Sequence, residues 1–338
     1  MARRPPIACG LAAAAACLAL AAPAGAGTLS VLTYNVAGLP EGISGSHPAV
    51  NTIQISPLLN PFDLVVVQED FFYHTELVTH VTHPYLSPPD PMDDSIGDGL
   101  NTLSRSPFAP ASLTRITWND CFGIVTNGAD CLTTKGFSFA RHEIEPGVFL
   151  DVYDWHADAG RDPGSNAARQ GNLRQLYAYI QQNSAGNAVL VAGDTNSRYT
   201  DQFDILPEML AAASLGDVWI ELVRGGSVPA LGAALQSCAP ATGPDCEVVD
   251  KILYRSSADL VLTPTAYHVY DDVFLDANGA PLSDHFPVWA LFDYQVPEPG
   301  AAPLLAAALW LGARRARRLR ASIGTLSHPR RSPPCAKP

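Results

Sequence analysis

Short apolar segments of three to seven residues recur through the middle of the chain. Most are rich in β-branched and aromatic residues and end near Gly, Pro, Asn or Asp, which is typical of buried β-strands bounded by turns. The segments that we predict to be strands are Leu29–Tyr34, Leu64–Val67, Leu113–Trp118, Gly136–Ala140, Val148–Asp154, Ala188–Ala192, Val248–Tyr254, Leu260–Leu262 and Phe286–Phe292.

Two segments between these strands favour helices. The first should begin at a cap on Ser165, and a second is expected over Phe203–Ala213. The apolar face of the first comprises Leu173, Leu176, Tyr177 and Ile180. Strands interleaved with helices indicate an α/β architecture built in layers. Residues 28–295 contain no internal repeat, low-complexity linker or block of charge, so we expect one domain.

The N-terminal end has the features of a targeting segment. Residues 1–26 carry Arg3 and Arg4, then an Ala- and Leu-rich run, then the small residues Ala24-Gly25-Ala26. This order is typical of a secretory signal peptide with its cleavage site. A buried N-terminal helix is the alternative.

The C-terminal end also differs from the middle. In residues 296–320, Pro-Glu-Pro precedes a 13-residue apolar run and a cluster of five arginines. This segment resembles the PEP-CTERM sorting signal of Gram-negative bacteria, which implies processing by an exosortase-like enzyme. The run is shorter than the ~20 residues that a membrane-spanning helix needs. A plain tail anchor is the alternative, and residues 321–338 form a tail.

The charge of the chain is concentrated between these ends. Residues 27–300 hold 11 basic residues and all 33 acidic ones, a net charge of −22. A protein whose affinity depends on neutralising many phosphates is usually basic, so this balance disfavours broad nucleic-acid contact. It is compatible with phosphoryl chemistry at one site, where a bound cation supplies positive charge.

Four cysteines remain once the two ends are set aside: Cys121, Cys131, Cys238 and Cys246. Four cysteines allow three pairings, and an exported protein can oxidise them. We prefer the local pairs 121–131 and 238–246, because each closes a loop that contains Gly or Pro. A zinc site is the alternative, although no C-x-x-C spacing is present.

Polar residues suited to catalysis follow several of the predicted strands. The motifs are LTYNVAG, LVVVQED, DVYDWHADAG, VAGDTNSR and LSDHFPV. They contribute Asn35, Glu69, Asp154, His156, Asp158, Asp194, Asn196, Asp284 and His285. Each motif alone has a structural explanation, such as a turn or a solvated strand end. Together they contain the parts of a hydrolytic site.

Metal-assisted hydrolysis of a phosphodiester explains the whole set. Mg²⁺ prefers carboxylate and amide oxygens, which Glu69 and Asn35 supply. An attacking water needs a base, and a His oriented by a carboxylate is a suitable one. We predict His285 as this base with Asp250, from CEVVDKILYR, as its partner. His156 would face the phosphate from the other side.

In this order and rough spacing, the motifs resemble the endonuclease/exonuclease/phosphatase superfamily. It includes deoxyribonuclease I, inositol-polyphosphate 5-phosphatases and bacterial neutral sphingomyelinases. The resemblance covers most of residues 28–292, and its most specific parts are the GD-x-N and SDH motifs. It implies an α/β fold, a four-layer sandwich with two packed mixed β-sheets flanked by helices. It also implies that the segment 98–108 forms a strand and loop supporting the site.

The resemblance implies a role for each matching residue. Glu69 is a metal ligand, and Asn35 lies near both metal and phosphate. Asp194 positions or deprotonates water, and Asn196 contacts the phosphate. Asp250 and His285 form the Asp–His dyad.

Three further positions match less completely. Asp284 corresponds to a structural or second-metal position. His156 corresponds to the other catalytic His, but relatives carry Asn-x-His or Thr-His where this chain has Asp154. Arg198 and Lys135 are additional candidates for substrate contact.

The region from Trp118 to Phe139, with its Cys pair and its Lys-Gly, resembles the sphingomyelinase-like branch. We therefore predict an exported phosphodiesterase of the periplasm, cell envelope or extracellular space, acting as a monomer. Its cofactor would be Mg²⁺, with Mn²⁺, Co²⁺ or Ca²⁺ as alternatives. Its substrate would be a phospholipid head group, with transient membrane contact, or a nucleic acid. A nuclease, a phosphatase and an inactive surface protein remain alternatives, since no exposed aromatic hairpin is evident between Ala258 and Pro281.

Overall fold

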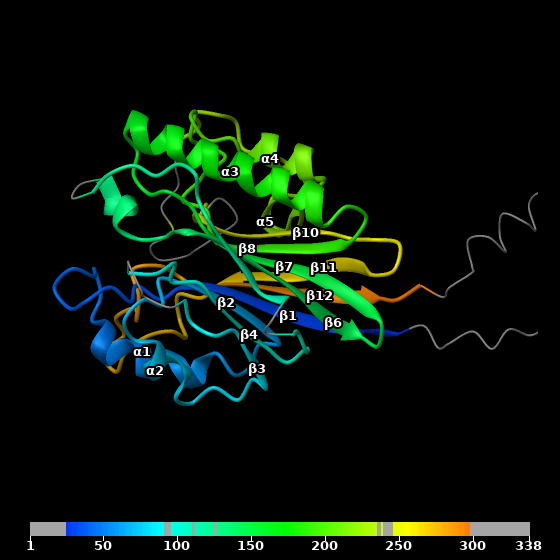
Figure 1. Cartoon of the computed structure of the whole chain (residues 1–338), viewed down its shortest axis with the longest axis horizontal. Helices are drawn as coiled ribbons and strands as arrows, with labels where there is room; N and C mark the ends of the chain where they lie inside the picture. The colour runs from blue at the N-terminus through cyan, green and yellow to red at the C-terminus, as the bar shows by residue number, and fades with distance from the viewer. Residues whose placement is uncertain are drawn as a thin grey trace, which may run out of the picture. The chain divides into compact units, whose positions relative to one another are not determined.

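The computed structural model describes residues 25–90, 96–109, 112–124, 127–234, 238 and 246–297 (Figure 1). Residues Gly25–Val296 form one compact unit, which contains the region 27–295 expected to be catalytic. The expected signal peptide and sorting signal fall almost wholly outside the described residues, and the tail does so completely.

Two six-stranded mixed sheets make up the centre of this unit. The first runs in the order β11 (Val261–Val269), β12 (Val288–Gln295), β1 (Ala26–Asn35), β2 (Leu64–Gln68), β4 (Asn101–Ser104) and β3 (Tyr85–Leu86). The second runs in the order β5 (Thr114–Thr117), β6 (Gly136–Glu145), β7 (Val148–His156), β8 (Ala188–Asp194), β10 (Asp250–Arg255) and β9 (Gly216–Asp217). Within each sheet one pair is parallel, β1 with β2 and β7 with β8.

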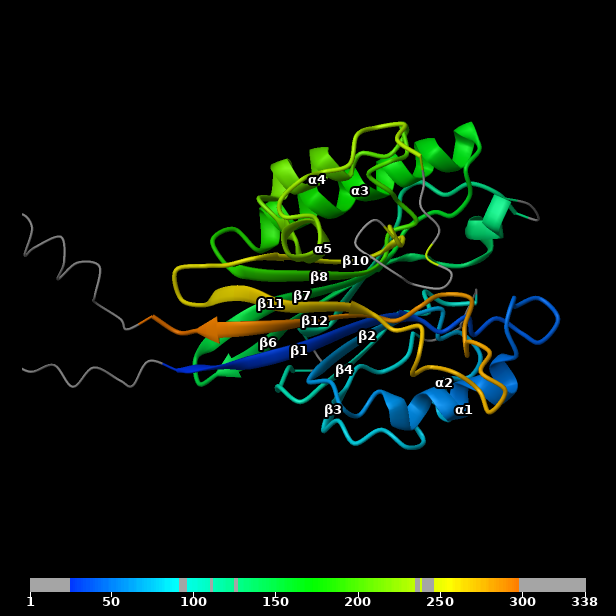
Figure 2. The same cartoon turned by 180° about the vertical axis from the view of Figure 1, so that it is seen from behind.

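Helices cover the outer faces of both sheets, which gives the predicted four layers (Figures 1 and 2). The helices α3 (Pro163–Asn183), α4 (Leu206–Ala213) and α5 (Val218–Leu222) pack on the second sheet. The helices α1 (Pro48–Leu58) and α2 (His74–Val78) pack on the first. The α/β sandwich expected from the sequence is therefore confirmed.

Strand alternation divides the apolar residues among three layers. Successive side chains of a strand point to opposite faces, so Leu150 and Val152 of β7 face the other sheet, whereas Tyr153 and Trp155 face α3. Nearly all of these side chains are fully buried. The layer between the sheets holds the two sheets face to face, and this brings their polar strand ends together.

Several local expectations need correction. Helix α3 begins at Pro163, and its cap is Asp162, whose Oδ1 accepts from the backbone N–H groups of Gly164 and Ser165. Ser165 instead lies in the first turn and donates its hydroxyl to Asp162. An Asp immediately before Pro combines a good N-cap with a good first helical residue, which explains the shift. Helix α4 starts at Leu206 rather than at Phe203.

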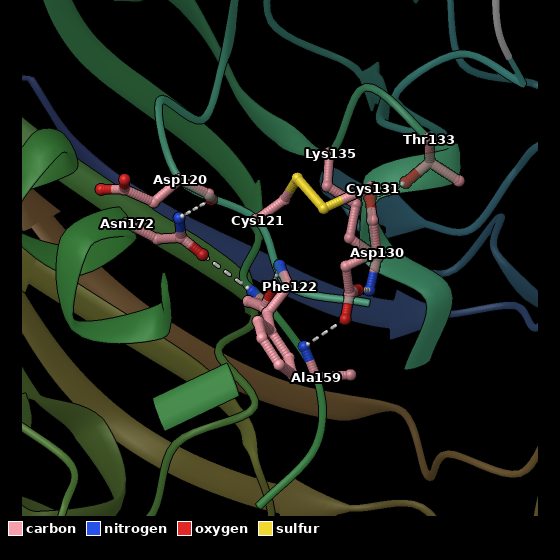
Figure 3. The surroundings of a disulfide bond; sticks show 10 residues. Asp120, Cys121, Phe122, Asp130, Cys131, Thr133, Lys135, Ala159 and Asn172 are labelled. Atoms are coloured by element: carbon pink, nitrogen blue, oxygen red, sulfur yellow. Dashed lines mark hydrogen bonds and ion pairs between the residues drawn. A yellow bond between two sulfur atoms is a disulfide. The ribbon is translucent and has the colours of Figure 1, made fainter. Parts of the chain in front are cut away.

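Both predicted disulfides are present, Cys121–Cys131 and Cys238–Cys246. Figure 3 shows that the first lies beside Lys135 and the loop that follows β7. The zinc alternative is thereby excluded for these four residues. Within the part of the chain that the structure describes, no helix combines the length and apolar character needed to cross a bilayer.

Candidate active site

The predicted site residues converge where the two sheets meet at one end of the strands. Asn35, His156 and Asp194 are the last residues of β1, β7 and β8. Asp250 opens β10 and pairs in register with Asp194, because β10 runs antiparallel to β8. Glu69 directly follows β2. Residues far apart in sequence thus occupy one edge of the sandwich.

Asn35 joins the two sheets at this edge. Its Nδ2 donates to Glu69 Oε1 at 3.0 Å and to Asp194 Oδ2 at 3.1 Å. Its Oδ1 accepts from the backbone N–H of Ala37 at 3.0 Å, which fixes the orientation of the amide. In this orientation Asn35 presents a hydrogen-bond donor to the site. The side chain of Glu69 is partly exposed.

Asp194 lies between two histidines. Its Oδ2 is 3.4 Å from His156 Nε2 and 3.6 Å from His285 Nε2, and the residue is almost fully buried. Burial alone would raise the pKa of Asp194, but the nearby His285, His156 and Lys135 together hold this pKa well below its usual range. Asp194 is therefore ionised and places a negative charge at the centre of the site.

His285 forms the predicted pair with Asp250. Its Nδ1–H donates to Asp250 Oδ2 at 2.9 Å, which leaves Nε2 facing Asp194. Burial opposes a charged ring, but Asp250 and Asp194 outweigh it and raise the pKa of His285 well above its usual value. Burial raises the pKa of Asp250, and His285 counteracts this. The pair is built to stabilise an imidazolium ring.

His156 occupies a different environment. It is 1% exposed, and its Nε2 lies 3.9 Å from Glu69 Oε1 in addition to its approach to Asp194. Its Nδ1 is buried and makes no hydrogen bond within the described residues. The backbone is held in place by Trp118, whose Nε1 donates to the carbonyl of His156 at 2.7 Å.

At the end of β8, residues 193–196 include backbone conformations that few residue types tolerate. A side chain on Gly193 would overlap the carbonyl oxygen of Trp155 on the neighbouring strand, so only Gly fits this position. Asn196 adopts a left-handed conformation with φ of 49°, and Glu69 does so with φ of 58°. Such conformations are costly for residues other than Gly and cluster at functional sites. Asn196 Nδ2 donates to the carbonyl of Ala157 at 3.1 Å.

Three candidates lie at the margin of this cluster. Asp284 is exposed, its Oδ1 lies 3.4 Å from Ser283 Oγ, and its side chain lies against Gly45. Arg198 is half-buried, and its guanidinium forms no ion pair with any residue that the structure describes. Lys135 already forms an ion pair with Asp130, and this carboxylate, with others nearby, raises the pKa of Lys135 despite burial.

The structure also shows supporting residues that the sequence motifs did not identify. Ser283 donates its hydroxyl to the carbonyl of Asn35 at 2.7 Å and accepts from the backbone N–H of His285 at 3.2 Å. Arg169 is fully buried and contacts both Asp204 and the carbonyl of Gly160. Both residues connect loops that carry site residues. A Ser directly within an SDH motif was the available signal for the first.

Among the residues described, one group of acidic and imidazole side chains has its ligand atoms within 4.8 Å of one another: Asp194, Asp250 and His285. Asp250 and His285 lie on one side of Asp194, and Glu69 with Asn35 approaches Asp194 from the first sheet. A His–carboxylate pair and a further carboxylate are the groups that acid–base chemistry beside a cation requires.

The fold is that of the deoxyribonuclease I-like α/β sandwich proteins. A model of the Endonuclease/Exonuclease/phosphatase family matches residues 32–285. The chain belongs to this family.

The sphingomyelinase of Mycobacterium tuberculosis (strain ATCC 25618 / H37Rv) is 37% identical to this chain over 276 residues, which is 79% of this chain and 53% of that protein. The sphingomyelinase of Mycobacterium bovis matches equally. The chain thus spans about half the length of the curated relatives it matches.

Solved structures share the fold at lower identity. Sphingomyelinase C from Streptomyces griseocarneus has a TM-score of 0.52 and 20% identity, covering 78% of this chain and 99% of that one. A mutant of beta toxin from Staphylococcus aureus, solved with bound magnesium ions, has a TM-score of 0.54 and 16% identity at the same coverages.

Proposed function

We propose that this protein is an exported, Mg²⁺-dependent phosphodiesterase that hydrolyses the phosphodiester of a phospholipid head group, as a sphingomyelinase-type phospholipase C does. The arrangement of Asp250, His285 and Asp194 beside Glu69 carries the proposal. The 37% identity to mycobacterial sphingomyelinases supports the substrate class.

The donor set suits a hard cation. Glu69 offers a partly exposed carboxylate next to the buried carboxylate of Asp194, and Asn35 bridges the two. Oxygen donors of this kind are those that Mg²⁺ prefers. We assign Glu69 as the residue that would hold the cation, with Asn35 beside it orienting the carboxylates of Glu69 and Asp194 through its Nδ2 donor; Asp284 would serve a second, more exposed position. A bound cation would draw charge from a phosphoryl oxygen and neutralise part of the developing negative charge.

The protein residues account for the remaining chemistry. A bound cation would offset part of the negative charge that raises the pKa of His285 and so favour its neutral form. With Nδ1–H donated to Asp250, the neutral ring presents Nε2 to take a proton from water, and Asp194 Oδ2, 3.6 Å from Nε2, helps to orient that water. His156 approaches from the opposite side of Asp194 and, with Asn196, donates hydrogen bonds to the phosphate and the departing oxygen. Arg198 would contact the substrate at the edge of the site. Lys135 is buried and paired with Asp130, so its contribution would be the positive charge that it places near Asp194.

Charge favours a lipid substrate over a nucleic acid. A net charge of −22 over residues 27–300 repels the extended phosphate backbone of DNA, whereas a single zwitterionic head group makes no such demand. Export is supported by the two disulfides, which form and persist in oxidising compartments. Processing of residues 296–320 by an exosortase-like enzyme is also part of the proposal.

A substrate panel tests the proposal. The purified chain is assayed on sphingomyelin vesicles, phosphatidylcholine vesicles, a chromogenic phosphodiester, a phosphomonoester and double-stranded DNA, each with Mg²⁺ and with EDTA. We expect Mg²⁺-dependent hydrolysis of sphingomyelin that the variant His285→Ala loses. The matched control is His268→Ala, which removes an exposed His on β11.

Two results would overturn the assignment. Strong DNA cleavage that falls steeply with salt, with no lipid hydrolysis, would make the protein a nuclease. Equal hydrolysis by wild type and the His285→Ala variant would remove the proposed base.

A further inference from the structure

Next to the active site, the side chains that fill the space between the two sheets change from apolar to polar. Along β2 the inward-facing residues are Leu64, Val66 and then Gln68; along β7 they are Leu150, Val152 and then Asp154. Thr33 takes the corresponding place on β1. Gln68 and Thr33 are fully buried, and Asp154 is 1% exposed.

These three side chains form a continuous link between the two sheets. Thr33 Oγ1 donates to Gln68 Oε1 at 3.3 Å within the first sheet. Gln68 Nε2 then donates to Asp154 Oδ1 at 2.7 Å in the second sheet. The second oxygen of Asp154, Oδ2, is buried and makes no hydrogen bond within the part of the chain that the structure describes.

The surroundings of Asp154 do not compensate a negative charge. The nearby cation is Arg115, whose Nη1 already binds both carboxylate oxygens of Asp98, at 2.7 and 2.6 Å. Burial raises the pKa of Asp154 well above its usual range; Asp98 adds to this, while Gln68 and Arg115 only partly oppose it. A buried carboxyl group without a cation partner is most stable when protonated.

The link lies next to two residues of the proposed mechanism. Gln68 immediately precedes Glu69, and Asp154 lies two residues before His156 on the same face of β7. No other hydrogen bond between side chains connects β2 to β7 among the described residues. A shift of one strand relative to the other would therefore move Glu69 and His156 apart.

We propose that Asp154 is a positioning residue that acts as a neutral carboxylic acid: it accepts a hydrogen bond from Gln68 across the two sheets and so fixes the spacing between Glu69 and His156. The positioning part rests on the proposed function. The protonation part stands on the buried environment alone and has a test of its own.

The first test compares two replacements of similar size. Asp154→Asn keeps an acceptor for Gln68 and a donor in place of the acid O–H, so we expect kcat within about threefold of wild type. Asp154→Leu leaves the Gln68 amide buried without a hydrogen-bond partner, and a buried polar group without a partner is strongly destabilising. We expect its kcat to fall roughly 10- to 100-fold with little change in KM, because proximity and orientation are what is lost.

A double variant separates positioning from simple misfolding. Replacing both buried partners with apolar groups removes the unsatisfied amide and gives up the longer hydrogen bond from Thr33, so Gln68→Leu with Asp154→Leu should be about as stable to urea as Asp154→Leu alone. Its kcat should nevertheless stay low, because the cross-sheet hydrogen bond is absent. Recovery of kcat in this double variant would show a packing role and overturn the positioning role.

The second test measures stability to urea and does not depend on enzymatic activity. If Asp154 is neutral in the folded chain, its pKa is higher in the folded than in the unfolded chain. The stability that Asp154 contributes is therefore lost as the pH rises above the unfolded pKa of 3.8. The urea midpoint of Asp154→Asn should therefore rise relative to wild type between pH 5 and pH 8. Asp293→Asn, at an exposed site on β12, is the control and should show no such rise. A falling relative midpoint for Asp154→Asn would mean an ionised Asp154 and would overturn the proposal, even if the protein were a phosphodiesterase.

Discussion

The two histidines on either side of Asp194 resemble each other in position but differ in the hydrogen bonding of their second ring nitrogen, Nδ1. Both direct Nε2 at Asp194 Oδ2, at 3.4 Å for His156 and 3.6 Å for His285. Nδ1 of His285 bonds to Asp250 at 2.9 Å, whereas Nδ1 of His156 is buried without a hydrogen bond to any described residue. A carboxylate partner lets the ring hold a proton, so we assign proton transfer to His285 and hydrogen bonding to His156.

The largest effect should come from His285 itself. Replacing it with Ala removes the proposed base, and a general base contributes up to about 10⁴-fold. We expect kcat for sphingomyelin hydrolysis to fall on this order, while thermal unfolding stays cooperative. Rescue of the rate by added imidazole would sharpen the assignment, since a small base would then replace the missing ring.

Asp250→Asn should give the next largest effect, because it makes His285 more like His156. Asp250 raises the pKa of His285, so its removal should lower that pKa and lose the fixed tautomer. We expect roughly a 10³-fold loss of kcat, within the range for acid–base groups. A rate close to wild type would contradict the division of roles between the two histidines.

His156→Gln should be milder, because Gln retains a donor. Loss of one donor to developing charge typically costs 10²- to 10³-fold, and a substitute donor should limit the fall in kcat to about 10²-fold. The pH–rate profile should keep its wild-type shape, since His285 is unchanged. A shifted limb in the profile would instead assign proton transfer to His156.

The smallest effect is expected for a third histidine, His142, which lies outside the site and influences stability rather than kcat. His142 is buried between the sheets, its Nδ1 lies 3.1 Å from Ser104 Oγ, and burial lowers its pKa to about 3. Its folded-state pKa lies below the ordinary value of 6.5, so the stability it contributes is lost as pH falls from 6.5 towards 3.

The variant His142→Phe keeps a ring against Phe108 but cannot take up a proton. Relative to wild type, its free energy of unfolding should therefore improve by about 3 kcal/mol between pH 7 and pH 4. Urea unfolding at the two pH values checks this. A constant difference would show that burial does not dominate at His142, and would weaken the argument that Asp250 and Asp194 reverse its effect at His285.

Much of the fold and of the central site could be predicted because the signals are local. Strand alternation and turn residues located the strands, and the polar residues after them located Asn35, Glu69 and Asp194. Convergence follows from the fold, since the ends of adjacent parallel strands share one edge. Helix α1 was not predicted because polar residues such as Asn51, Thr52 and Ser56 occupy part of its buried face, and α2 and α5 were not predicted because each contains only five residues.

The remaining features depend on packing that no local pattern specifies. Lys135 is neutralised by Asp130, and Asp284 faces solvent, although both stood in plausible motifs. The hydrogen bond from Gln68 to Asp154 forms only because the two sheets stack in one register. A polar residue at an inward position of a strand was the only sequence signal for it.

The most direct test is a Mg²⁺ titration of sphingomyelin hydrolysis by the full chain and by Glu69→Gln, after removal of bound metal with EDTA. Gln keeps the shape of the side chain but loses the carboxylate, so only cation binding should suffer. We predict no release of phosphocholine in EDTA, full recovery of wild type with Mg²⁺, and a much higher Mg²⁺ requirement for the variant. Equal rates in EDTA and in Mg²⁺, or identical titrations for both proteins, would contradict the account.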